Sequence, residues 1–368
     1  MLTKFTVHNF RKFENQIVFD FKAANYEFNI ECVKNQHIKT ALIYGKNGTG
    51  KTNLAWAMYD IVAHITDNNS HSLPTNNYLN QDSDLEYATF EYDFLFEKSK
   101  VHYSYKKNSE AELISEVLKI DDIEYISRKI GSPFTCSLKG TETLNKNLDK
   151  DNKISALKYI YNNSNLDKRS PPNRVFSQFM AFVNSMLLFR TLFDSLSYVG
   201  YKNGSDNIYR DILKKGNLKD FEFFLNECDI KCELAEANSN SEPTIGFKFK
   251  DKIIPISHIG STGTKSLALF YFWWQEIKNG KISFLFIDEF DSSYHFKLSR
   301  QIVKRLKEID CQVVLTTHNT SLLDNDLIRP DCGFRISENE ITSLHNSTNK
   351  DIRLAHNIEK MYRSGSFE

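Results

Sequence analysis

One stretch near the amino terminus has the residue types and the spacing of a phosphate-binding loop. The sequence GKNGTGKT, Gly45–Thr52, fits the pattern G-x-x-x-x-G-K-[S/T] at every fixed position. In such a loop, backbone N–H groups wrap a phosphate at the start of a helix, where the helix dipole also favours negative charge. Lys51 would reach the β- and γ-phosphates of a nucleotide, and Thr52 would hold Mg²⁺. The remaining candidate nucleotide contacts in this stretch are Gly45, Asn47, Gly48, Thr49, Gly50 and Asn53.

Two adjacent acids end an apolar segment much further along the chain. The sequence FLFIDE, Phe284–Glu289, predicts a buried strand with both carboxylates at its tip. A buried strand does not place two carboxylates there without a partner for them. Asp288 suits Mg²⁺, directly or through water. Glu289 is then placed as the general base on an attacking water. The alternative, a strand end capped by solvated acids, is weaker in a chain that also carries a phosphate loop.

A third candidate follows the apolar segment VVLTTHNT, Val313–Thr320, in which His318 comes just after the expected strand. A histidine at this place can hydrogen-bond a γ-phosphate or the attacking water and report on its presence. An ordinary polar loop histidine is the alternative interpretation.

The elements around these residues are those that the chemistry requires. The apolar segment Ala41–Tyr44 predicts a strand that runs directly into the glycine loop. After the loop, apolar residues recur at helical spacing from Leu54 to Ile65. Strand, loop and helix in this order are the context that a phosphate loop needs.

The chain as a whole reads as α/β, with one nucleotide-binding head that is split in the sequence. Alternating apolar residues predict antiparallel strands over 2–21 and 90–105. Residues 153–235 are expected to be mostly helical, with the apolar stretch Phe176–Phe193 as their core, and Glu236–Thr244 is expected to be a linker. The predicted parts are therefore 1–106, the first part of the head, 107–240, a compact and mainly helical insertion, and 241–368, the second part of the head.

A second glycine-rich stretch, GSTGT, Gly260–Thr264, precedes an apolar helix and the Asp-Glu strand. The order of phosphate loop, GSTGT, Asp-Glu strand and histidine strand resembles the ABC-type ATPases, whose signature sequence is typically LSGGQ. GSTGT keeps the serine and the second glycine of that signature. It departs from it at Gly260, Thr262 and Thr264.

This resemblance implies an ABC-type ATPase head, with a mixed central sheet and an antiparallel β subdomain, that binds ATP and Mg²⁺. In the family, the signature of one subunit caps the γ-phosphate held by another. Ser261, Gly263 and Thr264 would therefore complete the site of a second copy, in an ATP-bridged dimer or a higher oligomer. A generic helix cap is the alternative interpretation of GSTGT.

The amino-terminal sequence LTKFTVHNFRKF resembles the RecF/SMC-like and OLD-like branch of these ATPases, which makes Asn9 and Arg11 candidate nucleotide contacts; surface turn residues are the alternative. DEFDSSYH, Asp288–His295, and HNIEKMYRSGSF, His356–Phe367, are similar to bacterial ATPases of anti-phage defence, of the RloA, AriA and PtuA types. That similarity implies slow ATP hydrolysis coupled to the control of a separate effector protein.

The sequence also departs from these relatives. It has no long coiled-coil arms, and Gln81 and Gln178 are both candidates for the family's Q-loop glutamine. Only 50 residues follow His318, with no acidic cluster suited to two metals. We therefore expect any nuclease activity to lie on another protein.

Composition limits the partners. The 47 basic and 47 acidic side chains cancel, so bulk charge gives no indication of a nucleic-acid partner. The six scattered cysteines are expected to be reduced thiols. No apolar run approaches the roughly 20 residues that span a bilayer, and no signal-peptide pattern is present, so we expect a cytoplasmic protein without a membrane partner.

Two other functions stay open at this point. A RecF-like DNA-repair ATPase would need a basic surface, for which the clusters Lys304, Arg305 and Lys307, or Lys214 and Lys215, are the candidates. A scaffold that binds ATP with negligible turnover is the second alternative.

Overall fold

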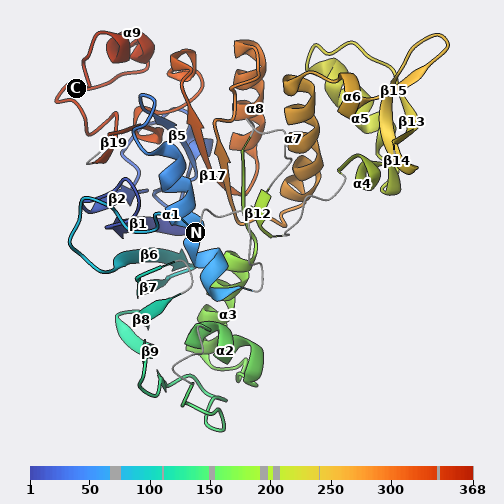
Figure 1. Cartoon of the computed structure of the whole chain (residues 1–368). Coiled ribbons are helices and arrows are strands. Elements are labelled where there is room, and N and C mark those ends of the chain that lie inside the picture. Colours follow the sequence, from blue (N-terminus) through green and yellow to red (C-terminus); the bar gives the residue numbers. More distant parts are fainter. Residues whose placement is uncertain are drawn as a thin grey trace.

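The computed structural model describes residues 1–66, 76–109, 112–148, 154–190, 198–201, 208–239, 241–337 and 340–367. Within these residues, one seven-stranded sheet forms the centre of the protein, in the order β12-β11-β16-β17-β5-β18-β19 (Figure 1). Its strands are β5 (Thr40–Tyr44), β11 (Met186–Arg190), β12 (Tyr198–Gly200), β16 (Phe284–Asp288), β17 (Gln312–Thr317), β18 (Gly333–Ile336) and β19 (Ile341–Ser343).

The five inner strands of this sheet are parallel, and β12 and β19 pair antiparallel at its two edges. Parallel strands buried on both faces read as continuous apolar runs, which explains FLFI in β16 and ALIY in β5. Because parallel strands all end at the same edge, the last residue of β11 and the segments that follow β5, β16 and β17 meet there.

A second sheet is antiparallel, in the order β10-β9-β8-β7-β6-β1-β2. Its strands are β1 (Leu2–His8), β2 (Ile17–Asp20), β6 (Ala88–Phe96), β7 (Ser99–Lys107), β8 (Leu113–Ile120), β9 (Ile123–Lys129) and β10 (Thr135–Cys136). In β6 and β7, buried and partly exposed residues alternate, as the period of two requires when one face packs against a core.

Helix α1 (Lys51–Ile65) lies between the two sheets. On one side, the Tyr59 hydroxyl donates to the carbonyls of Leu187 and Phe284 in the central sheet, at 2.5 and 3.2 Å. On the other side, the Tyr92 hydroxyl of β6 donates to the Ala57 carbonyl at 2.9 Å. The helix that starts at the glycine loop is therefore held by both sheets.

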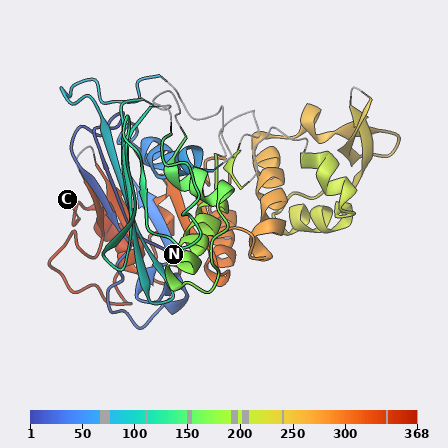
Figure 2. The ribbon, with the colours of Figure 1, turned by 90° about the horizontal axis from the view of Figure 1, so that it is seen from below.

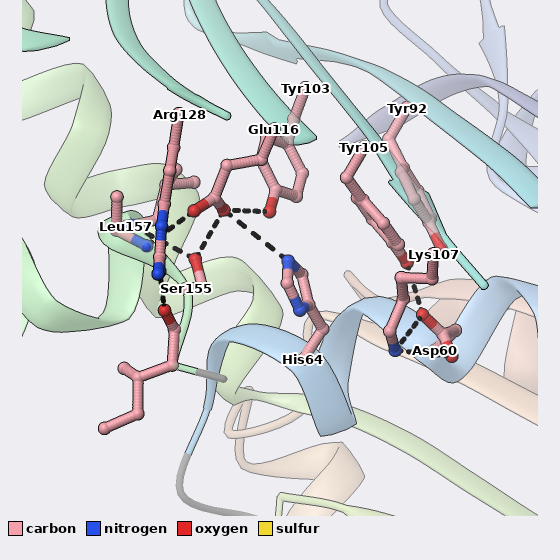
Figure 3. Close-up of polar contacts among 12 residues, drawn as sticks. Asp60, His64, Tyr92, Tyr103, Tyr105, Lys107, Glu116, Arg128, Ser155 and Leu157 are labelled. Atoms are coloured by element: carbon pink, nitrogen blue, oxygen red, sulfur yellow. Dashed lines mark hydrogen bonds and ion pairs between the residues drawn. The ribbon is translucent and has the colours of Figure 1, made fainter. Parts of the chain in front are cut away.

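Two buried carboxylates fix the far half of α1 to the antiparallel sheet (Figure 3). Asp60 lies 2.9 Å from Lys107 Nζ and accepts a hydrogen bond from the Tyr105 hydroxyl at 2.8 Å. Glu116 of β8 lies 3.5 Å from His64 Nε2. The contacts of Glu116 reach α2 (Ala156–Asn163) as well, because Ser155 Oγ, at the start of that helix, donates to Glu116 at 2.6 Å.

A smaller lobe projects to one side of the two-sheet body, as the two orthogonal views show (Figures 1 and 2). It contains α4 (Ile208–Lys214), α5 (Leu218–Glu227), α6 (Ile256–Ile259), α7 (Thr262–Lys278) and the three-stranded sheet of β13 (Leu234–Ser239), β14 (Glu242–Lys248) and β15 (Ile253–Pro255). The other elements are β3 (Val33–Lys34), β4 (His37–Ile38), α2 (Ala156–Asn163), α3 (Pro171–Asn184), α8 (Phe296–Glu308) and α9 (Ile358–Arg363).

The segment 107–240 differs from the mainly helical insertion expected for it. It holds α2 to α5, but β8 and β9 extend the antiparallel sheet and β11 joins the central sheet. The boundary at 106 falls inside β7, and the expected linker Glu236–Thr244 takes part in the β13–β14 hairpin. The expected helical core Phe176–Phe193 divides, since α3 ends at Asn184 and the apolar run after it is β11.

None of the helices in the described ranges combines the length and the apolarity that crossing a membrane requires.

Candidate functional site

The glycine loop has a backbone that only glycine accommodates at two positions. A Cβ on Gly45 would lie 2.6 Å from Thr49 Oγ1 and 2.9 Å from the Ile336 carbonyl oxygen. Gly50 has φ 101°, and a Cβ there would lie 2.7 Å from the buried Phe13 ring. Glycine adopts the left-handed backbone of Gly50 with little loss of free energy, because it has no Cβ. The residues between them, Asn47 and Gly48, are exposed to solvent.

Lys51, the first residue of α1, reaches back across this loop. Its Nζ donates to the carbonyls of Gly45 at 2.7 Å and Lys46 at 3.1 Å. Burial lowers the pKa of Lys51, against the opposing effect of Asp288 and Glu289. The ammonium group therefore already lies within the loop, next to the place where a phosphate would be bound.

Asp288 is completely buried and accepts hydrogen bonds from two hydroxyl groups. Thr52 Oγ1, in the first turn of α1, donates to Asp288 Oδ2 at 2.8 Å. Thr316 Oγ1, on β17, donates to Asp288 Oδ1 at 2.6 Å. Arg190 Nε, at the end of β11, lies 2.8 Å from Oδ2. A threonine hydroxyl and a carboxylate are hard oxygen ligands of the kind that Mg²⁺ prefers, so the donor set fits this ion.

Glu289 has a left-handed backbone with φ 52°. Its N–H donates to Thr316 Oγ1 at 2.7 Å, the same oxygen that donates to Asp288. This conformation costs on the order of 1–3 kcal/mol for a residue with a side chain, and such strain persists where the surrounding structure enforces it. Here β16 and β17 enforce it, so that the chain turns immediately after the strand.

His318 lines a cavity of about 230 Å³ together with the start of the glycine loop. The lining of this cavity also includes Tyr44, Gly45, Lys46 and Arg335. Burial and the nearby Lys51 ammonium lower the pKa of His318 below its ordinary value. A neutral imidazole can both donate and accept a hydrogen bond, so His318 is suited to a contact with a phosphate or with water.

The stretch Gly260–Thr264 forms the start of α7, in the side lobe. Ser261 is the exposed N-cap residue, and its Oγ accepts from the N–H of Thr264 at 3.2 Å. A Cβ on Gly263 would lie 2.8 Å from the Ser293 carbonyl oxygen. No hydrogen bond joins this stretch to the glycine loop in the described part of the chain. Within one copy, this stretch lies in the side lobe, whereas the glycine loop lies at the start of α1, in the two-sheet body (Figure 1).

The two amino-terminal candidates differ in their positions. Arg11 lies beside the loop, because its Nε donates to Asn53 Oδ1, in the first turn of α1, at 3.1 Å. Asn9 is fully buried, and its amide donates to the carbonyls of Leu85 and Tyr87 at 2.8 Å each. The side chain of Asn9 therefore holds a neighbouring segment of backbone, and its contact with a nucleotide stays a prediction.

The two glutamines considered for the Q-loop lie in different places. Gln81 is exposed, and its amide donates to the nearby Leu79 carbonyl. Gln178 lines a different cavity, together with Ser283 and Gln312 at the amino ends of β16 and β17, the sheet edge opposite to the glycine loop. Sequence reasoning missed Arg190 as well as Thr316. The signal for Arg190 is the cation that ends the apolar run MLLFR, which the sequence pattern places in a helix.

A family model described as "AAA domain, putative AbiEii toxin, Type IV TA system" matches residues 41–324. This range runs from β5 past His318 and covers most of the chain. The chain belongs to this family. The membership and the sheet topology confirm the expected fold class, an α/β P-loop ATPase head of the ABC type with a mixed central sheet and an antiparallel β subdomain.

Among solved structures, the chain is similar to the following three over most of its length. The SMC head domain from Thermotoga maritima is 13% identical over 93% of this chain and 98% of that chain, with a TM-score of 0.45. The recombination mediator RecF with ATP is 16% identical over 93% and 99%, with a TM-score of 0.42. The Smc head from Pyrococcus furiosus, bound to the C-terminal domain of ScpA, is 10% identical over 94% and 97%, with a TM-score of 0.46. No curated protein matches the chain.

Proposed function

We propose that the protein binds and slowly hydrolyses ATP, and that two copies assemble around ATP with Mg²⁺ to control a separate effector protein. One observation carries the proposal. The hydrogen bond from Thr52 to Asp288 joins the glycine-loop helix to the acidic strand end across 236 positions of sequence. Beside a glycine loop, this is the pair that holds the metal of a nucleotide.

Each residue of the site then has a distinct role. Lys51 and the loop N–H groups would hold the phosphates, and Thr52 and Asp288 would hold Mg²⁺, which supplies positive charge against the triphosphate when bound. Glu289 accepts the proton of the attacking water. His318 contacts the γ-phosphate or that water. Arg11, which lies against Asn53, is a further candidate contact for the nucleotide.

The second copy would provide the signature residues. Ser261 is exposed at the amino terminus of α7, a helix of 17 residues. Its hydroxyl and the N–H of Gly263 are the donors that such a helix start offers to an anion. Thr264 lies in the same turn. Because this stretch lies in the side lobe and the glycine loop lies in the two-sheet body, we assign it to the site of a second copy.

The family description names a putative AbiEii toxin and a Type IV toxin–antitoxin system, which supports a role in defence. The finer parts of the proposal are a role against phage, a place in the cytoplasm and a toxic activity that lies on a partner such as a nuclease. They rest on the resemblance of the sequence to the defence ATPases. The described residues contain no group of three or more His, Cys, Asp or Glu side chains placed to hold a metal ion.

The basic clusters that a DNA-repair role would need are largely neutralised. Lys307 is buried and lies 2.8 Å from Glu31, and Arg305 lies 2.8 Å from Glu227. Lys215 lies 2.8 Å from Glu276. These pairs favour the defence role over a RecF-like DNA clamp.

The test is the solution mass of the Glu289→Gln protein by light scattering, with and without ATP and Mg²⁺. We expect ATP to raise the mass, because binding without turnover keeps the copies together. Ser261→Arg should abolish this rise, since it blocks the shared site, while Ser257→Arg, on the exposed face of the preceding turn, should leave it. A monomer under every condition would exclude the shared site.

A further inference from the structure

Arg190 is the last residue of β11, the strand that pairs with β16, and β16 ends in Asp288. In the parallel ladder of β11 and β16, Arg190 is the direct partner of Asp288. Its Nε lies 2.8 Å from Asp288 Oδ2, and 23% of its side chain is exposed while that of Asp288 is fully buried. The register of the two strands therefore places the two residues side by side, and only the arginine of this ion pair is partly exposed to solvent.

The same carboxylate oxygen has two roles in this structure. Asp288 Oδ2 accepts the Thr52 hydroxyl and also contacts Arg190. An uncompensated buried carboxylate is strongly unfavourable, and the guanidinium of Arg190 supplies a counter-charge to Asp288. Arginine does not lose its proton in proteins, so this counter-charge can be removed only by moving the side chain.

We propose that Arg190 is an internal counter-cation of Asp288, which holds this carboxylate when no nucleotide is bound and withdraws from it when ATP and Mg²⁺ are loaded. The proposal rests on the proposed function of this site. The Arg190 guanidinium and a Mg²⁺ ion a few ångströms away would repel each other, and this repulsion is strongest in the low dielectric of the protein interior. Arg190 therefore competes with the metal for Asp288, and sets how much Mg²⁺ the protein needs before it holds ATP.

Removal of the charge should then have two opposite effects. Arg190→Gln leaves Asp288 without its counter-charge, so the nucleotide-free protein should unfold at a lower temperature. The same variant should need about tenfold less Mg²⁺ to bind nucleotide, because the competing cation is gone. If Arg190 had a purely structural role, its replacement would lower the unfolding temperature and also weaken nucleotide binding.

The experiment titrates Mg²⁺ into the full chain with a fluorescent, non-hydrolysable ATP analogue, and follows binding by anisotropy. Wild type, Arg190→Gln, Arg190→Lys and Arg300→Gln are compared. Arg190→Lys keeps the charge and should stay near the wild-type Mg²⁺ requirement. Arg300 forms a comparable ion pair with Asp324, at 2.7 Å, outside the site, and its loss should leave the midpoint unchanged.

Thermal unfolding with Mg²⁺ alone is the second measurement. Mg²⁺ should stabilise Arg190→Gln, whose carboxylate is open to the ion, and leave wild type unchanged. An unaltered Mg²⁺ midpoint in Arg190→Gln would overturn the counter-cation role while leaving the proposed function intact. Loss of nucleotide binding at saturating Mg²⁺ in that variant would also overturn it, since Arg190 would then be a phosphate ligand. Failure of wild type to bind the analogue at any Mg²⁺ concentration would overturn the proposed function and this inference with it.

Discussion

Thr316, on β17, donates its hydroxyl to Asp288, at the end of β16, across 2.6 Å. Its oxygen also accepts the N–H of Glu289 at 2.7 Å. One side chain on the neighbouring strand thus holds both acids of the candidate site. The orientation of the metal-binding carboxylate and the turn that carries the general base depend on the same hydroxyl.

Thr316→Val keeps the shape of this side chain and removes both hydrogen bonds. We expect ATP hydrolysis to fall at least tenfold, while unfolding free energy falls by about 1–3 kcal/mol, because a buried carboxylate loses one donor. Steady-state ATPase assays and urea unfolding measure the two effects. Thr342→Val, on the edge strand β19, is the control and should change neither. Unchanged hydrolysis in Thr316→Val would show that this hydroxyl does not position the acids.

The start of α7 should not tolerate a methyl group at Gly263. The Ser293 carbonyl oxygen would lie 2.8 Å from the new Cβ, and a backbone oxygen cannot move aside as a flexible side chain can. Alanine favours helices over glycine by about 1 kcal/mol, so without this contact the substitution would stabilise the protein. We expect Gly263→Ala to lower the melting temperature and ATP-dependent assembly. Thr262→Ala, at the exposed neighbouring position, should have little effect. A melting temperature above that of wild type for Gly263→Ala would contradict the close contact.

The buried pair of Asp60 and Lys107 should show strong coupling (Figure 3). Only 4% and 3% of the two side chains are exposed, and Nζ lies 2.9 Å from the carboxylate. Lys107→Met strands Asp60 as an unpaired buried charge, so we expect a loss of about 3–5 kcal/mol in unfolding free energy. Asp60→Asn combined with Lys107→Met should recover much of this loss, because no charge is left to compensate. Urea unfolding of the two single variants and the double variant gives the coupling. A double variant no more stable than Lys107→Met would contradict the coupling between Asp60 and Lys107.

Glu276 should make stability depend on pH in acid. Although burial opposes its ionisation, Lys215 and Lys281, at 2.8 and 2.7 Å, lower the pKa of Glu276 to about 2. The folded protein therefore binds this proton less readily than the unfolded chain, so the stabilisation is present above pH 4.5 and is lost as the pH falls toward about 2. Glu276→Gln should cost about 2 kcal/mol at pH 7, allowing for the exposure of both lysines.

Urea unfolding at pH 7 and pH 3 measures this effect. The difference between wild type and Glu276→Gln should be smaller at pH 3. Glu233→Gln removes an exposed carboxylate that pairs with Lys248, and should change stability little at either pH. An equal difference at both pH values for Glu276→Gln would mean that its charge does not stabilise the fold.

The sequence predicts the parts of this site that sit at the ends of parallel strands. Gly45–Thr52 and His318 each follow a fully buried strand, and Asp288 ends one. A continuous apolar run ending in polar residues is a strong local pattern. The parallel ladder then brings them to one edge of the sheet. Thr316 was not singled out, because a buried threonine within a strand gives no sign of the carboxylate on the neighbouring strand that it contacts.

The segment between the two halves of the head was harder to predict. In β8 and β9 only one face is buried, so these strands read as polar and irregular. The five-residue strand β11 directly follows α3, and both are apolar, so periodicity alone does not separate them. For that reason the sequence pattern predicts a helix at Arg190. The resemblance places Asn9 at the nucleotide, whereas the burial of its side chain follows from contacts with residues 85 and 87, which its own sequence neighbourhood does not reveal.

The most direct test of the shared site mixes two inactive variants. Lys51→Ala disables the glycine loop and keeps the signature, whereas Ser261→Arg keeps the loop and disables the signature. A mixed dimer then contains one intact site, so an equal mixture should recover about a quarter of wild-type ATPase activity, from half of the dimers with one of two sites each. Activity in the mixture no higher than the mean of the two separate variants would contradict a site formed by two copies.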